Sequence, residues 1–218
     1  MPRIIAHRRN GWIMSRGTST IVTLAALMAA LLISRLSQGQ SQGGDRLTVL
    51  KAGMVLNFVK YTEWPSDVFE SADGPIVITV VGRCALTDVL ARAVQGQEIG
   101  GRRVSVMQVN YPEFEPGRDN SNDERLREFQ SRLHRSHVVY VCEQEASRVK
   151  QIIALLQGAA VLTVSDAPRF AERGGMLGLV VREGRLAFDA NAEAIRQTRL
   201  KVSSKVLRLA RIVETTED

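Results

Sequence analysis

Residue types that carry catalysis or bind metals are scarce in this sequence of 218 residues. It contains three histidines and two cysteines, and aromatic residues make up only 5% of the chain. It has no phosphate-binding loop and no Gly-x-Ser-x-Gly elbow, and the turn at Gly82 has one glycine where a dinucleotide-binding turn needs three. These absences argue against the common nucleotide-dependent enzymes and the common serine hydrolases.

Acidic residues are missing from the first 39 positions, which hold five arginines. The whole chain has a formal net charge of +6, but the remaining 179 residues carry 24 basic and 23 acidic side chains. The basic excess therefore belongs to the N-terminus, and the body lacks the footprint of a nucleic-acid-binding protein. A composition of 44% hydrophobic and 24% charged residues predicts that the body folds as one globular domain.

The N-terminal arginines flank an apolar run, which is the layout of an export signal. Residues 21–33 contain one polar residue, Thr23, and the small residues Ser37 and Gly39 suit cleavage after Gly39. Two outcomes stay open: a cleaved signal peptide, or a retained anchor, because the uncharged run 17–34 would rise about 27 Å as a helix. In both cases more positive charge precedes the apolar run than follows it. Positively charged flanks stay in the cytoplasm, so we expect the N-terminus to stay there and the body to cross the membrane.

Apolar, strand-like runs alternate with helix-like segments from residue 47 onward. Strands are expected at 76–81, 103–109, 137–142, 160–164, 176–181 and 185–189, and helices at 47–64, 87–94, 124–133, 145–157, 192–198 and 203–213. This alternation predicts parallel strands with right-handed crossovers, and the last two strands flank a turn. The predicted fold is an α/β, single-domain sandwich with a mostly parallel central sheet, an antiparallel C-terminal hairpin and flanking helices.

The predicted organisation has four parts. Residues 1–39 are a signal peptide or an N-terminal membrane anchor, 40–46 a linker, 47–213 the α/β domain and 214–218 a disordered tail. Within the domain, residues 110–132 are rich in polar residues and structure-breaking prolines, so we expect a polar surface insertion there.

The two cysteines, Cys84 and Cys142, each lie at the end of a predicted strand. If these strands are parallel neighbours, both cysteines reach the same edge of the sheet. An even number of cysteines in an exported domain favours a disulfide. The alternative, two buried free thiols, stays open because the sequence does not show that the two Cα atoms come within about 7 Å.

Few residues suggest chemistry. His134 and His137 have a spacing that suits a metal only in a helix, and His137 opens a predicted strand. Ser165 and Asp166 resemble half of a hydrolytic pair, but no base can be assigned to them, so capping of the strand end is the favoured interpretation. Asn191 is predicted to cap the helix that starts at residue 192. The sequence therefore predicts no catalytic, cofactor-binding or metal site.

A series of short motifs follows in a fixed order along the domain. They are Lys51-Ala52, Phe58-Val59-Lys60-Tyr61-Thr62-Glu63-Trp64-Pro65, Val161-Leu162-Thr163-Val164-Ser165-Asp166, Phe170-Ala171, Gly174-Gly175-Met176, Phe188 with Asn191, and Leu200-Lys201-Val202-Ser203-Ser204-Lys205-Val206-Leu207-Arg208-Leu209-Ala210. From about residue 47 to 213 the sequence resembles the YfiR-like family of bacterial periplasmic regulatory proteins. The resemblance implies a compact α/β protein that often forms a homodimer.

The resemblance also implies a function. The best-studied member of the family represses an inner-membrane diguanylate cyclase by binding its periplasmic part, and the disulfide state affects this repression. The chain is accordingly expected to be a non-enzymatic repressor of a membrane-bound signalling protein, with a diguanylate cyclase and cyclic-di-GMP signalling as the first expectation. It would lie in the periplasm, or stay anchored in the inner membrane with its body in the periplasm, and touch the membrane only through an uncleaved leader.

Two alternative functions stay open: a periplasmic small-molecule binding protein, with a cleft at the carboxyl ends of the strands, and, less favoured, an envelope hydrolase. The residues expected to contact a partner or ligand are Lys60, Trp64, Phe170, Gly174, Gly175, Met176, Lys201 and Lys205. A structural interpretation competes with this one, because large apolar residues are usually core, glycines supply turns, and the two C-terminal lysines flank a helix start.

Overall fold

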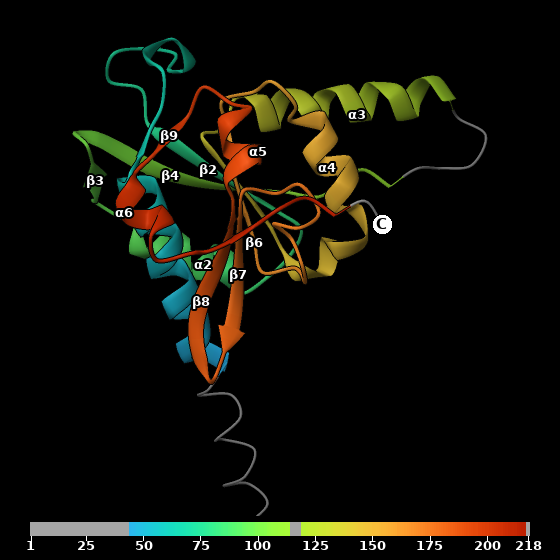
Figure 1. Ribbon diagram of the computed structural model, residues 1–218. Coiled ribbons are helices and arrows are strands. Elements are labelled where there is room, and N and C mark those ends of the chain that lie inside the picture. The colour runs from blue at the N-terminus through green and yellow to red at the C-terminus, as the bar shows by residue number, and fades with distance from the viewer. Residues whose placement is uncertain (1–43, 114–118, 217–218) are drawn as a thin grey trace, which may run out of the picture. The chain divides into compact units, whose positions relative to one another are not determined.

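The computed structural model describes residues 44–113 and 119–216 (Figure 1). The leader predicted at 1–39 and residues 40–43 of the predicted linker lie outside the described residues, and residues 44–46, predicted as linker, are helical. Residues from Arg46 onward form one compact unit. Within the two described ranges, no helix is both long and apolar enough to cross a membrane.

An eight-stranded mixed sheet forms the centre of this unit, in the order β10-β8-β7-β6-β5-β2-β4-β3. Its strands are β2 (Ile76–Val81), β3 (Glu98–Ile99), β4 (Arg102–Val109), β5 (Val138–Val141), β6 (Leu162–Ser165), β7 (Leu177–Arg182), β8 (Arg185–Asn191) and β10 (Arg211–Val213). Five neighbouring strands, from β7 to β4, run parallel. Strand β8 is antiparallel to β7, which confirms the mostly parallel sheet and the C-terminal hairpin.

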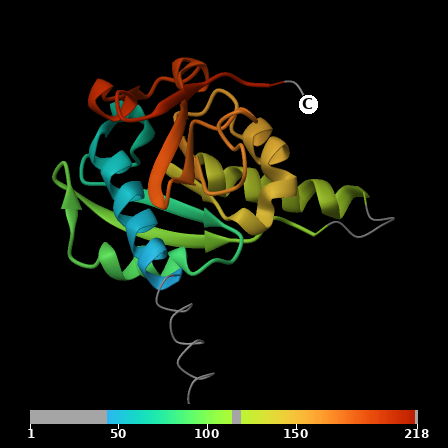
Figure 2. The ribbon, with the colours of Figure 1, turned by 60° about the horizontal axis from the view of Figure 1, so that its bottom comes forward.

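The central strands are mostly apolar because helices cover both faces of the sheet. The first described helix spans residues 44–60, and its part in this unit is called helix 46–60. Helix 46–60 and α2 (Leu86–Ala93) lie on one face of the sheet, and α3 (Asp119–His134) and α4 (Val149–Leu155) on the other (Figure 2). Tyr140 and Val139, adjacent in β5, accordingly belong to different cores. The single helix predicted at 145–157 is a 3-10 helix, η2 (Glu143–Arg148), followed by α4.

The segment predicted as a polar surface insertion, 110–132, also contributes to the core. Helix α3 begins at Asp119, ahead of the expected start, and continues to His134. Its side chains Phe129 and Leu133 are buried, and the ring of Phe129 packs 5.3 Å from the ring of Tyr111. The apolar residues that make these contacts are few among many charged ones, which is why the composition of the segment indicated only a surface loop.

The predicted helix 203–213 is wrong in its second half. Helix α6 spans only Ser204–Leu207, and Arg211–Val213 form β10, which pairs parallel with β8. The backbone of β8 offers an unpaired edge there, and Arg211 donates two hydrogen bonds to the carboxylate of Asp189. Long-range pairing therefore overrides a helical pattern that is local to the sequence.

The end of the chain corrects the disordered tail predicted at 214–218, as far as residue 216. The amide of Asn191 donates to the hydroxyl of Thr215, and the backbone N–H of Thr216 donates to the carbonyl of Glu172, 2.8 Å away. These bonds fix the chain against the loop that precedes β7.

Short elements complete the fold. Helix 46–60 ends before the expected Trp64, because residues 62–63 form β1 (Thr62–Glu63), which pairs with β9 (Lys201–Val202) in a two-stranded ribbon. A 3-10 turn, η1 (Ser66–Val68), follows β1. Helix α5 (Ala192–Arg196) begins as predicted, with Asn191 Oδ1 accepting a hydrogen bond from the N–H of Ala194.

Candidate functional site

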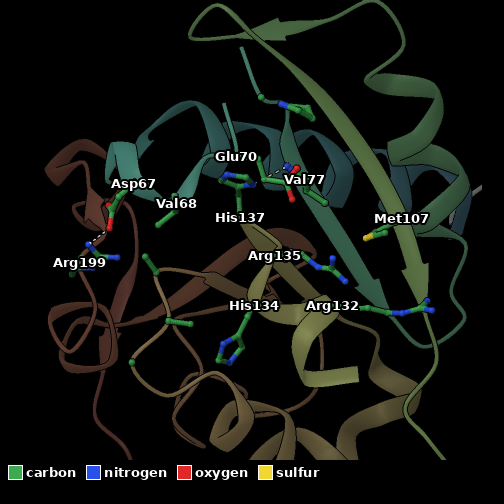
Figure 3. Close-up of a pocket in the computed structure, with 15 residues that line it drawn as sticks. Asp67, Val68, Glu70, Val77, Met107, Arg132, His134, Arg135, His137 and Arg199 are labelled. Atoms are coloured by element: carbon green, nitrogen blue, oxygen red, sulfur yellow. Dashed lines mark hydrogen bonds and ion pairs between the residues drawn. The ribbon is translucent and has the colours of Figure 1, made fainter. Parts of the chain in front are cut away.

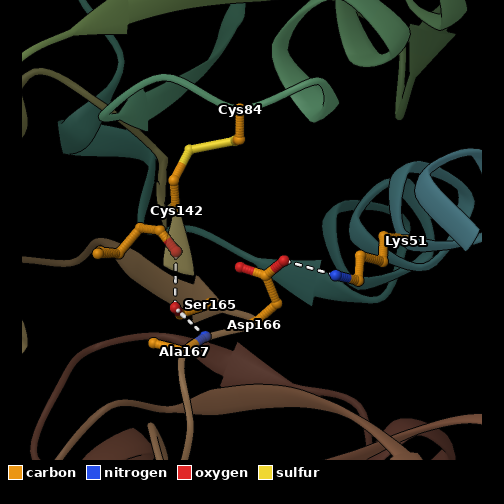
Figure 4. Close-up of a disulfide and its surroundings, with 7 residues drawn as sticks. Lys51, Cys84, Cys142, Ser165, Asp166 and Ala167 are labelled. Carbon is orange, nitrogen blue, oxygen red and sulfur yellow. Dashed lines mark hydrogen bonds and ion pairs between the residues drawn. A yellow bond between two sulfur atoms is a disulfide. The ribbon is translucent and has the colours of Figure 1, made fainter. Parts of the chain in front are cut away.

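The carboxyl ends of β2 and β5 are joined by a disulfide between Cys84 and Cys142 (Figure 4). The two strands are parallel neighbours, and the Cα atoms of the cysteines are 6.1 Å apart. The two strands are therefore neighbours, as a bond requires, and the Cα atoms are close enough for it. The alternative of two free thiols is excluded. Cys142 is fully buried, whereas Cys84 is half-buried and lines a surface pocket.

A half-buried ion pair lies beside the disulfide. Lys51, from helix 46–60, donates through Nζ to Oδ2 of Asp166 at the end of β6, 2.6 Å away (Figure 4). The other oxygen of this carboxylate, Oδ1, is buried without a hydrogen bond, and so is the hydroxyl of Tyr140. Burial, and then the neighbouring Asp166 carboxylate, raise the pKa of Tyr140. The pair thus ties the first helix to the sheet and keeps a neutral phenol beneath it.

Ser165 is committed to the backbone. Its hydroxyl donates to the carbonyl of Val141 and accepts from the N–H of Ala167, at 2.6 and 2.9 Å. The basic side chain beside Ser165 and Asp166 is that of Lys51, which forms an ion pair with Asp166 and not a bond with Ser165. The interpretation of Ser165 as a strand-end cap is confirmed. Within residues 44–113 and 119–216, no cluster of three or more histidines, cysteines or carboxylates is suited to a metal ion.

Four of the predicted contact residues lie in the loop between β6 and β7 and are mostly interior. Phe170 is 1% exposed and Met176 is 6% exposed. A Cβ atom on Gly175 would lie 2.2 Å from the ring of Phe170, so only glycine allows this ring to fit. Gly174 has a φ of +95°, which favours glycine, and it lines a small recess with Met176. Packing alone accounts for these residues.

The other four predicted contact residues lie near the β1–β9 ribbon. Lys60, Lys201 and Lys205 are exposed, whereas Trp64 is half-buried and donates through Nε1 to the carbonyl of His137. The N–H of Ser203 donates to the carbonyl of Tyr61, which brings α6 beside the end of helix 46–60. The structure therefore brings together the segments that carry the three lysines and gives the tryptophan a structural bond.

A cavity of about 720 Å³ opens at the amino ends of β2, β5 and β6 (Figure 3). This position differs from the cleft expected at the carboxyl ends of the strands. The Asp67–Arg199 ion pair lies on one side of the opening, and Arg132 and Met107 lie on the other. Its lining residues include Asp67, Val68, Glu70, Val77, Met107, Arg132, His134, Arg135, His137 and Arg199.

His137 lies in the wall of this cavity and is 5% exposed. Its Nδ1 accepts a hydrogen bond from the N–H of Val77, and its ring stacks on Phe69 at 4.4 Å. The guanidinium of Arg102 covers Phe69, 3.7 Å from the ring centroid. Burial, and secondarily the charge of Arg102, lower the pKa of His137 from 6.5 to about 4. The imidazole is therefore neutral in the folded protein at pH 7.

We expect this histidine to make the fold sensitive to acid. Between pH 6.5 and 4 the unfolded chain binds a proton that the folded chain excludes, so the contribution of His137 is complete above pH 6.5 and is lost as the pH falls toward 4. The lost stability is about 3 kcal/mol. Urea unfolding of the wild-type protein and of His137→Asn across this range measures the difference, because the variant lacks the titrating group.

The control for this experiment is His134→Asn, which removes an exposed imidazole of the same cavity. If wild-type protein and His137→Asn lose the same free energy of unfolding between pH 6.5 and 4, the assignment to His137 is wrong.

Sequence reasoning missed Lys51 as the partner of Asp166, and it missed the stacked group of Arg102, Phe69 and His137. Lys51 belongs to one of the family motifs, which indicated that the residue matters but not which residue it contacts. The members of the stacked group come from three separate segments, and nothing local to any of them indicates the contact.

Two comparisons bear on what the chain is. A sequence model of the family described as YfiR/HmsC-like matches residues 48–211, well over half of the chain. No curated protein matches the chain.

Proposed function

Because the chain belongs to the YfiR/HmsC-like family, we propose that it is a non-enzymatic periplasmic regulator that binds and represses an inner-membrane diguanylate cyclase. The family match over residues 48–211 carries this proposal. Family membership fits a regulator of signalling that works in the periplasm. The identification of the partner as a diguanylate cyclase is taken from the resemblance of the motifs between residues 47 and 213.

The polar side chains at the carboxyl ends of the strands that could take part in catalysis are engaged with other groups of the domain. This supports a function exerted by binding a partner. Ser165 is engaged by two backbone groups, Asp166 is neutralised by Lys51, and both cysteines are in the disulfide. These groups stabilise the carboxyl ends of the central strands and hold helix 46–60 against the sheet. A rigid surface of this kind lowers the entropy lost on binding a partner.

The cavity at the amino ends of the strands supports small-molecule binding as a second candidate function. Its volume is within the usual range for ligand sites, about 300–1,000 Å³. Its wall combines apolar side chains such as Met107 and Val68 with the charged groups of Arg135 and Glu70. A regulator that releases its partner in response to an envelope cue needs such a site, so the two candidate functions are compatible.

The proposal is tested by deleting the gene and measuring cellular cyclic-di-GMP. We expect its concentration to rise several-fold and to return to the starting value when the full chain is supplied. The full chain, purified from detergent-solubilised membranes, should bring with it a protein that converts GTP to cyclic-di-GMP. Adding an excess of the pure chain to this fraction should lower the cyclase activity.

A chain that lacks residues 1–39 is the matched control, because it should accumulate inside the cell and fail to restore the cyclic-di-GMP concentration. Unchanged cyclic-di-GMP after deletion, together with a captured fraction that has no cyclase activity, would count against the proposal.

A further inference from the structure

Positive charge is concentrated in the segment 194–213. These residues contain six basic side chains and no acidic one, although Glu193 precedes them and Glu214, Glu217 and Asp218 follow. Three of the six are held by carboxylates, in the ion pairs Arg196–Glu193, Arg199–Asp67 and Arg211–Asp189. The other three, Lys201, Lys205 and Arg208, are exposed and make no ion pair with any described residue.

Large apolar side chains project from the same part of the molecule. Leu209, which follows α6, is 78% exposed, and Ile212, in β10, is 53% exposed. Tyr61 is 39% exposed, and Lys60 lies 5.8 Å from the centroid of its ring. Isolated exposed apolar residues are common in soluble proteins, but their coincidence with unpaired cations is informative.

These residues form one ridge. The segment from β9 through α6 to β10 runs along one side of the molecule in Figure 2. Tyr61 belongs to it through the hydrogen bond from Ser203 to its carbonyl, 2.9 Å long. We call this surface the C-terminal ridge; it consists of Lys60, Tyr61, Lys201, Lys205, Arg208, Leu209 and Ile212. Two exposed carboxylates adjoin it in the described chain, that of Glu63, opposite Lys201 in the ribbon, and that of Glu214, two residues after Ile212. The ridge therefore has a clear positive excess.

The residue types of the ridge distinguish between its candidate partners. The cores of protein–protein interfaces are depleted in lysine, whereas three of the four cations here are lysines. Lysine and arginine beside protruding leucine, isoleucine and tyrosine are typical of surfaces that lie in a membrane interface. There the apolar side chains enter the boundary between headgroups and acyl chains, and the cations bind lipid phosphates.

We propose that the C-terminal ridge docks the folded domain onto an anionic phospholipid surface. Leu209 and Ile212 enter the interface, and Lys60, Lys201, Lys205 and Arg208 bind the negatively charged headgroups. This contact adds to any contact made through the leader. It does not depend on the identity of a protein partner, because it is measured on lipid alone.

The test is binding of the full chain to vesicles, followed by co-sedimentation. Vesicles that contain phosphatidylglycerol are compared with vesicles of phosphatidylcholine alone. We expect the double variant Lys201→Glu/Lys205→Glu to bind the anionic vesicles at least about tenfold more weakly than the wild type. Leu209→Ser should weaken binding about threefold or more, because it removes apolar area from the interface. Raising the salt concentration should reduce the effect of the charge reversals.

The matched control is Arg125→Glu/Arg127→Glu, which reverses two exposed charges on α3, outside the ridge. It should bind anionic vesicles within about twofold of the wild type. All variants carry the same N-terminus, so its own affinity for lipid cancels from the comparison. Thermal unfolding checks that each variant is folded.

Equal binding of the wild type and the ridge variants would overturn the proposal, and so would equal loss in the control. An acidic polypeptide partner is the competing occupant. It would be indicated if poly-L-glutamate removed the chain from anionic vesicles and Leu209→Ser had no effect on vesicle binding; that result also overturns lipid docking.

Discussion

Replacing Cys84 and Cys142 with serine is expected to lower the free energy of unfolding by about 4 kcal/mol. The two cysteines are 58 positions apart, and a cross-link over that distance removes much conformational freedom from the unfolded chain. For a domain of this size the melting temperature should fall by about 8–16 °C. Urea unfolding of the wild type and of the double variant, both in the absence of reductant, measures the difference.

The wild type unfolded and refolded in reductant is the companion measurement, because unfolding exposes both sulfur atoms, including that of the buried Cys142. Its stability should approach that of the double variant, whose own stability should not respond to the reductant. A wild type that is equally stable with its thiols reduced and with the disulfide intact would show that the cross-link contributes nothing.

Phe170→Ala is expected to lower the free energy of unfolding by about 4 kcal/mol, because the ring is fully buried and its removal leaves a cavity. Gly175→Ala should cost about 2–3 kcal/mol in the wild type, since the new methyl group would lie 2.2 Å from the Phe170 ring. In the Phe170→Ala background the same methyl group enters vacated space, so its cost should disappear. The coupling energy from the four proteins should therefore exceed about 1 kcal/mol.

Gly174→Ala is the matched control for this cycle. Its cost, about 1–2 kcal/mol, arises from the positive φ of Gly174, and the nearest atom to a Cβ there is 3.8 Å away on Ile153. It should be the same with and without the Phe170 ring. If Gly175→Ala costs as much in the Phe170→Ala background as in the wild type, the clash does not explain the glycine.

The result also separates two interpretations of the motif around Phe170 and Gly175. Residues that contact a partner lose binding when they are changed and keep their stability, whereas residues that pack against each other lose stability first. The buried ring and the missing Cβ favour the second interpretation, so binding defects in these variants would follow from unfolding.

The hydrophobic pattern was enough to predict the central strands and most of the helices. Continuous apolar runs such as 76–81 and 137–142 are typical of strands buried on both faces, and the structure has β2 and β5 there. Asn191 was predicted as a helix cap from its position alone, because the N–H that its side chain accepts from, that of Ala194, is only three positions away. The hairpin was predicted from its turn at Glu183-Gly184.

Other features depended on segments that lie far apart in the chain. Arg211–Val213 form a strand because β8 presents an edge to them, although their own sequence continues a helical pattern. The cavity lies at the amino ends of the strands because 66–70, 132–137 and 158–160 converge there, and no one of these segments indicates the others.

The sequence by itself determined the central buried strands and most of the helices, because hydrophobic periodicity is a property of neighbouring residues. Only the tertiary structure decided which polar groups meet. Lys51 and Asp166 are 115 positions apart, and Tyr61 reaches Ser203 across most of the domain. Such pairs form only when distant segments pack together and their polar groups lose contact with water. They depend on how the elements are arranged and not on any local pattern.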